Sequence, residues 1–161
     1  DARPDDHAVR AELHHHRSVS GGGDATGGEH DHRQASGPRD LFDKRVFWHV
    51  ATIGPDGQLQ STPVWGGFED GHFVFSLTKG RQKYRNLQDN PMVAVSGTDP
   101  DNPYRYLELR GKVVRVDDDP SNAFIDSMAK KYMDLDAYPY HQPGDERVVM
   151  RVEPVATSHM G

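Results

Sequence analysis

The chain has 161 residues, a formal net charge of -6 and no cysteine. This length suits one domain with a hydrophobic core, and the acidic balance argues against broad electrostatic binding to nucleic acid. The lack of cysteine excludes disulfides, thiolate metal ligands and cysteine nucleophiles. No apolar run approaches the roughly 18 residues that a membrane helix needs, and the first residues lack the apolar stretch of a secretion signal. We therefore expect a cytoplasmic protein that binds neither nucleic acid nor membranes.

Residues 1–39 differ in composition from the rest of the chain. They contain clustered glycines, scattered charges and no aromatic residue, so they can bury too little apolar surface to offset the entropy lost on ordering. We predict a disordered or loosely ordered extension over residues 1–39 and one globular domain over residues 40–161. Six of the ten histidines lie in this extension. Because adjacent histidines on an irregular chain do not preset ligand geometry, we predict no metal site.

The first half of the globular domain has the pattern of antiparallel strands joined by turns. Residues 47–53 are rich in β-branched and aromatic residues, and the Gly-Pro-Asp-Gly segment at 54–57 is a strong turn signal. Residues 58–65 would return as a second strand, with Pro63 at a bulge or at a point where the ladder opens; an ordinary edge strand is the alternative. After a turn rich in glycine, the alternation at 72–77 predicts another strand.

The second half of the domain continues this pattern. Residues 92–96 and 104–116 predict two strands, the longer one with a bend at Gly111. Asp119 and Pro120 predict the N-cap and first turn of an amphipathic helix, and a last strand is predicted at residues 147–152. About six antiparallel strands with two short helices are typical of a small β-barrel rather than a parallel sheet.

A cluster of cations lies between the strand at 72–77 and the break before Pro91. It consists of Lys79, Arg81, Lys83 and Arg85. The free N–H groups and positive dipole end of a helix N-terminus favour an anion, and Arg and Lys are suitable phosphate ligands. The alternative is a solvated helix face, although such a face would carry more acids among its bases. Taken alone, the run leaves both interpretations open, a phosphate-binding turn and a solvated face.

No pattern in the chain identifies a catalytic acid, base or nucleophile. The histidines of the globular part form no triad-like arrangement, and paired carboxylates, phosphate loops and dinucleotide fingerprints are missing from the sequence. We name no catalytic residue. This lack is consistent with hydride chemistry, in which a cofactor carries the difficult step and the protein positions it against a substrate.

Several motifs in fixed order extend the interpretation beyond single residues. They are Val-Ala-Thr-Ile-Gly-Pro-Asp-Gly at 50–57, Ser-Thr-Pro-Val-Trp at 61–65, Arg-Gln-Lys-Tyr-Arg-Asn-Leu at 81–87, the segments 89–91 and 99–111, and 138–144. With these motifs, residues 41–157 resemble the split β-barrel flavoproteins of the pyridoxamine 5'-phosphate oxidase-like superfamily, and within it the oxidoreductases that use the deazaflavin coenzyme F420. The resemblance implies a mainly β fold: a six-stranded antiparallel split β-barrel of the FMN-binding type with two or three short helices.

The resemblance also implies where a cofactor would bind. Arg81 and Lys83 would hold its phosphate, and Asn86 would help to shape the turn. The cofactor ring would lie along a wall formed by Gln60, Ser61, Thr62, Pro63, Val64, Ser76, Leu77 and Thr78.

Further implied contacts involve a second copy of the chain. The resemblance implies a homodimer with two cofactor sites between the protomers, in which Tyr104 and Tyr106 of the partner chain cover the cofactor. Packing in the core or in the dimer is the alternative role for these tyrosines. Lys79 and Arg85 would meet the acidic tail of a deazaflavin. Trp65 could line the substrate pocket or belong to the core.

Together these features predict an F420-dependent reductase that transfers hydride to a conjugated, electron-poor small molecule of quinone, enone or tetrapyrrole type. An FMN-binding oxidase or reductase of the same barrel is an alternative, because FMN also offers a phosphate to Arg81 and Lys83. A second alternative is a non-catalytic module that binds a cofactor or haem.

Overall fold

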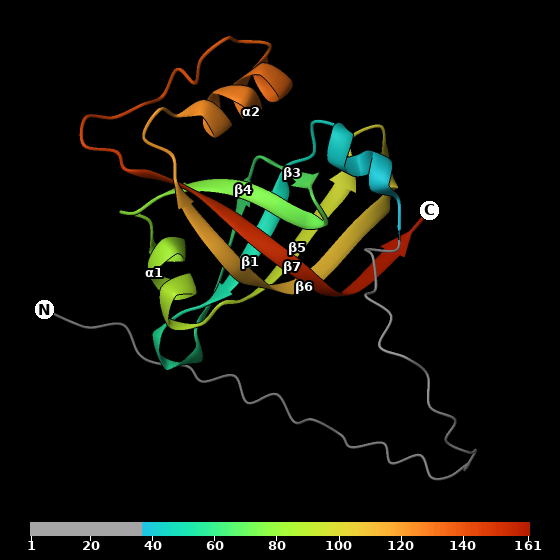
Figure 1. Ribbon diagram of the computed structural model, residues 1–161. Helices are drawn as coiled ribbons and strands as arrows, with labels where there is room; N and C mark the ends of the chain where they lie inside the picture. Colours follow the sequence, from blue (N-terminus) through green and yellow to red (C-terminus); the bar gives the residue numbers. More distant parts are fainter. Residues whose placement is uncertain (1–36) are drawn as a thin grey trace, which may run out of the picture. The chain divides into compact units, whose positions relative to one another are not determined.

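The computed structural model describes residues 37–161, which are coloured in Figure 1. Within them, seven antiparallel strands form one sheet in the order β2-β1-β5-β6-β7-β4-β3. The strands are β1 (Trp48–Ile53), β2 (Leu59–Val64), β3 (Gly66–Glu69), β4 (His72–Thr78), β5 (Met92–Asp99), β6 (Asn102–Asp118) and β7 (Arg147–Met160). The α-helices are α1 (Gln82–Asp89) and α2 (Ala123–Met133), and the 3-10 helices are η1 (Arg39–Asp43) and η2 (Pro55–Gly57).

The sheet curls on itself as an open barrel (Figure 1), which confirms the predicted mainly β, antiparallel split-barrel class. It has seven strands, whereas we expected six. The additional strand is β3, whose glycines we had interpreted as turn residues. Gly66 instead pairs with Phe75 of β4, and a Cβ atom at Gly66 would come within 2.5 Å of the Phe73 ring. This glycine therefore allows close packing inside the sheet.

Strands β6 and β7 are longer than their local patterns predicted because they pair with each other along most of their length. Their register runs from Tyr106 opposite Met160 to Asp118 opposite Val148, with irregularities at Arg110/Gly111 and Val113/Arg115. The bend predicted at Gly111 is confirmed by the first of these irregularities.

The start of α2 differs from the prediction. The helix begins at Ala123, so Pro120 lies before its first turn, and Asn122 is the N-cap residue. Asp119 still caps the helix, because its carboxylate accepts hydrogen bonds from the backbone N–H groups of Ala123 and Phe124 at 3.1 and 3.0 Å. Because Asp119 binds N–H groups four and five positions further along the chain, the helix starts later than the Asp-Pro pair indicated.

Two apolar clusters lie in the described residues. The larger one fills the curled sheet and includes the alternating residues Phe73, Phe75 and Leu77 of β4. The smaller one is formed by α2 and includes Tyr132, with Trp65 and Tyr138 packed against it. This second cluster holds the segment after α2 close to the end of β2, where the candidate site lies.

Neither α-helix of residues 37–161 has the length and apolar character that a membrane crossing requires. The predicted extension over residues 1–39, with its histidine runs, lies outside the described residues except for its last three positions and stays a prediction.

Candidate functional site

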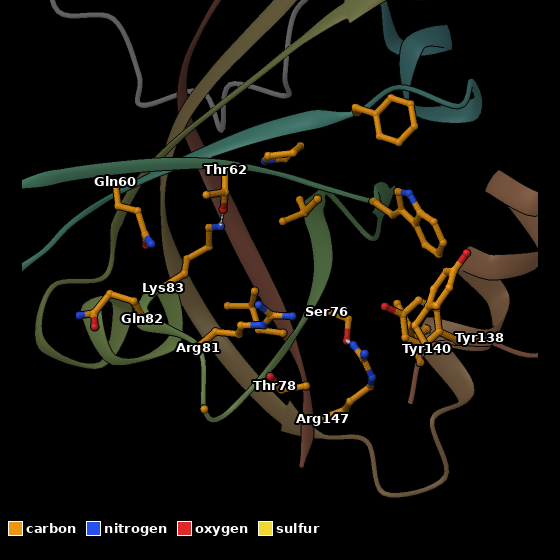
Figure 2. Close-up of a pocket in the computed structure, with 17 residues that line it drawn as sticks. Gln60, Thr62, Ser76, Thr78, Arg81, Gln82, Lys83, Tyr138, Tyr140 and Arg147 are labelled. Carbon is orange, nitrogen blue, oxygen red and sulfur yellow. Dashed lines mark hydrogen bonds between the residues drawn. The ribbon is translucent and has the colours of Figure 1, made fainter. Parts of the chain in front are cut away.

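A cavity of about 700 Å³ lies against strand β2, the end of β4 and the start of α1. Figure 2 shows that its labelled side chains come from these elements and from the segment that leads into β7. At one end are the first residues of α1 with Gln60 and Thr62, and at the other are aromatic residues near α2. The described lining residues are Phe47, Gln60, Thr62, Pro63, Val64, Trp65, Ser76, Leu77, Thr78, Gly80, Arg81, Gln82, Lys83, Ile125, Tyr138, Tyr140 and Arg147.

The charge of this lining contrasts with that of the whole protein. The chain carries a formal net charge of -6, yet the described lining residues include three cations, Arg81, Lys83 and Arg147, and no acid. A concave surface lined by one sign of charge concentrates ligands of the opposite sign. The cavity is therefore suited to an anionic molecule.

Lys83 is the most informative residue of the cavity. Lys83 is only 4% exposed, and its ammonium group donates a hydrogen bond to the Thr62 hydroxyl of β2. No carboxylate among residues 37–161 forms an ion pair with it. Burial, with a smaller contribution from the neighbouring Arg81, lowers the pKa of Lys83 to about 8. A buried charge without a counter-ion is unfavourable, and an anion bound in the cavity would supply that counter-ion.

The sequence of α1 explains why this lysine points inward. Lys83, Asn86 and Leu87 occupy the buried face of the helix, as the spacing of three and four residues requires. Asn86 donates a hydrogen bond to the Thr52 hydroxyl at 3.0 Å and accepts one from Gln82 at 2.8 Å. Asn86 thus attaches α1 to β1 and holds Lys83 in place beneath the cavity.

The four cations predicted as one cluster separate into two groups. Arg81 and Lys83 line the cavity. Lys79 lies outside it and pairs with Asp118 and Glu146 at 3.2 and 3.4 Å. Arg85 donates to the carbonyl of Gly80 at 2.9 Å. Two of the four predicted cations therefore line the cavity, and two do not.

Most of the predicted wall is brought together. Seven of its eight residues line the cavity: Gln60, Thr62, Pro63, Val64, Ser76, Leu77 and Thr78. Ser61 is exposed and does not line the cavity. The bulge or ladder opening expected at Pro63 is wrong, since the register from Trp48/Val64 to Ile53/Leu59 is continuous. Proline is tolerated here because β2 is the first strand of the sheet order.

Two predicted residues lie away from the cavity of their own chain. Tyr104 and Tyr106 belong to β6, and Tyr104 is 78% exposed. Their expected role is to cover the site of a partner chain, and this stays a prediction.

Seven lining residues had no role in the sequence-based prediction, among them Tyr138, Tyr140 and Arg147. The two tyrosines were part of a motif, and Arg147 was only the start of a strand. Trp65 satisfies both of its alternatives, because it lines the cavity and also stacks on Tyr132 with ring centroids 5.1 Å apart. The two tyrosines close together after α2, Tyr138 and Tyr140, were the sequence signal that could have revealed this end of the cavity.

Comparison with known proteins agrees with this geometry. The family described as pyridoxamine 5'-phosphate oxidase matches residues 39–161. A solved structure named F420 reductase is 40% identical, with a TM-score of 0.68, over 76% of this chain and 97% of its own. A comparison with curated proteins gave no match.

Two more distant structures share the fold. A conserved hypothetical protein from Mycobacterium tuberculosis is 24% identical, with a TM-score of 0.61 over 75% of this chain and 80% of its own. An FMN-binding protein related to pyridoxamine 5'-phosphate oxidase, from Nostoc punctiforme, is 13% identical, with a TM-score of 0.53 over 71% and 73%. Because the family match spans the barrel and both sides of the cavity, the chain belongs to the pyridoxamine 5'-phosphate oxidase family, a family of split-barrel oxidoreductases.

Proposed function

We propose that this protein is a deazaflavin (coenzyme F420)-dependent reductase acting on a conjugated, electron-poor small molecule of quinone, enone or tetrapyrrole type. The observation that carries the proposal is the buried Lys83 beside Arg81 in a cavity whose described lining contains no acid. The 40% sequence identity to a structure named F420 reductase favours a deazaflavin over other phosphorylated cofactors.

The residues of the cavity fit such a cofactor. Arg81 and Lys83 would bind its phosphate, and the ammonium group would keep its hydrogen bond to Thr62. Residues 60–64 of β2 would lie along the ring, where an edge strand has backbone N–H and C=O groups that do not pair within the sheet. Ser76, Leu77 and Thr78 would form the opposite wall.

The chemistry divides between the cofactor and the chain. When bound, a reduced deazaflavin supplies a hydride to the acceptor, which also takes up one proton from water and is thereby reduced by two electrons. The chain contributes the positioning of both molecules and a cavity partly closed to solvent. We assign the proton transfer to no side chain.

An FMN-dependent oxidase or reductase is the second candidate, favoured by the FMN-binding protein among the structural neighbours. Isothermal titration separates the two: we expect F420 to bind and FMN to bind more weakly. A deazaflavin without the phosphate-linked tail is the matched control and should also bind more weakly. The absence of F420 binding at tens of micromolar would overturn the proposal, and a yellow purified protein with a flavin spectrum would favour FMN.

Turnover distinguishes an enzyme from a binding module. Reduced F420 should be oxidised in the presence of a quinone or enone, which is followed by the return of the absorbance of the oxidised deazaflavin. Tight binding without turnover over a broad set of activated alkenes and quinones would instead indicate a module that stores or senses its ligand.

We further propose that the enzyme is a cytoplasmic homodimer with its sites between the protomers. Apolar side chains that are about half exposed lie on the paired strands β6 and β7, among them Val114, Val116 and Val155.

Mixed dimers of the Lys83→Ala and Tyr104→Ala variants test the shared site. If each site combines Lys83 of one subunit with Tyr104 of the other, a mixed dimer regains one intact site. If both residues serve the same site from one subunit, no activity returns. Cell fractionation tests the location.

A further inference from the structure

The end of the cavity opposite Lys83 has a cation of its own. Arg147 opens β7 and pairs in register with Thr78 of β4. Its guanidinium lies 4.6 Å from the centroid of the Tyr138 ring and reaches the Ser76 hydroxyl at 3.4 Å. Figure 2 shows Arg147 between Ser76 and the two tyrosines, away from the Lys83 end.

Arg147 lacks the partners that a structural arginine normally has. Its Nε atom is buried without a hydrogen-bond acceptor, as is that of Arg151, but no carboxylate of residues 37–161 forms an ion pair with Arg147. Arg151, four positions along the same strand, pairs with Glu69 and Asp117, both at 3.5 Å. The two arginines lie on the same face of β7, so the difference arises from their surroundings and not from the strand.

The surroundings of Arg147 are aromatic. Trp65 meets Tyr138 edge to face at 5.8 Å, and Tyr138 meets Tyr140 in the same way at 5.6 Å. All three line the cavity. Aromatic side chains bind flat molecules by stacking and edge contacts, while a guanidinium fixed against a ring presents its remaining N–H groups to a carboxylate in a planar fork.

We propose that this end of the cavity is a subsite for a planar, conjugated acceptor that carries a carboxylate, with Arg147 as the residue that selects the acid. The inference rests on the proposed function for the reaction that follows binding. The carboxylate itself is not altered in that reaction, because the hydride and the proton are added to the conjugated part of the molecule.

A binding experiment with two matched probes tests the subsite. We would titrate the protein with anthraquinone-2-carboxylate and with its methyl ester, which has the same rings and no charge, and follow tryptophan fluorescence with and without oxidised F420. The wild type should prefer the acid. Arg147→Gln should weaken binding of the acid by about 10- to 100-fold and change binding of the ester by less than about twofold.

Two further variants provide controls. Arg147→Lys should restore part of the preference for the acid because it keeps the charge, whereas Arg151→Gln should leave both probes unaffected because Arg151 already has carboxylate partners. If Arg147→Gln does not fold, as judged by circular dichroism, Arg147→Lys takes its place: a preference for the acid as strong as that of the wild type would then overturn the subsite.

Three results would overturn the subsite: no preference of the wild type for the acid, equal loss of both probes in Arg147→Gln, or a loss of F420 affinity in that variant without a change for the acid. The last result would assign Arg147 to the cofactor. Failure of F420 to bind the wild type would overturn the proposed function, and the preference for the acid, measured without cofactor, would still test the subsite.

Discussion

Two clusters of charged side chains in this protein differ in what neutralises them. The first, here called the clasp, consists of Asp40, Lys44, Asp99, Asp101 and Arg105. Lys44 contacts Asp99 and Asp101 at 2.8 and 2.9 Å, and Arg105 contacts Asp99 at 2.9 Å as well as Asp40. These contacts connect η1 to strands β5 and β6. Every cation of the clasp has a carboxylate partner within the chain.

The second cluster is the pair Arg81 and Lys83, which has no such partner among the described residues. The pKa values reflect this difference. Hydrogen bonds from Lys44 and from the backbone of Asp101 hold the pKa of the Asp99 carboxyl well below its usual range, whereas burial lowers the pKa of Lys83 to about 8. In the clasp, the fold favours the charged state of its groups. At Lys83 it penalises that state, which is expected of a site completed by a ligand.

The largest effect that would separate the two clusters is the loss of Lys83. We expect Lys83→Ala to weaken F420 binding by about 1.5–3 kcal/mol, roughly 10- to 150-fold in Kd, because a charge-assisted contact to the phosphate is lost. Isothermal titration measures the change.

The thermal stability of the ligand-free protein is the matching control for Lys83. Lys83→Met should not lower the midpoint of thermal unfolding, because it removes a buried charge that has no partner and keeps the apolar stem. Unchanged F420 affinity in Lys83→Ala would mean that the phosphate binds elsewhere.

The next effect is the pH dependence of binding. The phosphate needs the charged form of Lys83, so F420 affinity should be full below pH 8 and should fall above it, by up to about tenfold per pH unit. Titrations between pH 7 and 10 follow the decline, and Lys83→Met should not show it. A wild-type affinity that stays constant over this range would contradict the assignment.

The stability of the ligand-free protein should change with pH in the opposite direction. The pKa of Lys83 is lower in the folded protein than in the unfolded chain, so between about pH 8 and 10.5 the unfolded chain binds more protons. Its contribution to the free energy of unfolding should therefore rise with pH through this window. Denaturant melts of wild type against Lys83→Met isolate that contribution.

Removing a charge from the clasp should destabilise the protein, in contrast to removing the charge of Lys83. Asp99→Asn should lower the midpoint of thermal unfolding at pH 7, because Lys44 and Arg105 lose their shared carboxylate. Since the pKa of Asp99 is lowered in the folded protein, its stabilisation is present above the unfolded pKa and is lost as the pH falls. The difference between wild type and variant should thus narrow below about pH 4. F420 affinity at pH 7 should stay the same.

The smallest effect should come from Lys79, the cation that the sequence grouped with the cofactor-binding pair. Because Asp118 and Glu146 already neutralise it, Lys79→Ala should change F420 affinity by less than about threefold, in contrast to Lys83→Ala. A loss as large as that of Lys83→Ala would show that Lys79 reaches the deazaflavin tail, as the family resemblance implied.

Much of the fold followed from local patterns. The alternation in β4, the turn between β1 and β2 and the bend at Gly111 each depend on neighbours in sequence, and each was predicted. Strand β3 was not, because glycine in a turn and glycine in a tightly packed strand look alike until the Phe73 ring is placed. The ends of β6 and β7 were also missed, since their length depends on the partner strand.

The candidate site shows the same division. Arg81 and Lys83 were found because one short segment contains both and the family resemblance implied a phosphate-binding role for them. Arg147 was not, because its neighbour Ser76 is 71 positions away in the chain, and only the β4–β7 register brings the two together.

The sequence by itself determined that this chain forms a β-rich barrel with a run of cations after one of its strands, because strand alternation, turn residues and the cation run are local properties. The tertiary structure alone decided which cations are free to bind a ligand. Lys79 and Lys83 are four positions apart and chemically identical, but the first folds against two carboxylates and the second against a hydroxyl in a buried cavity. Long-range pairing sets the counter-ions, and the counter-ions distinguish a structural charge from one that awaits a ligand.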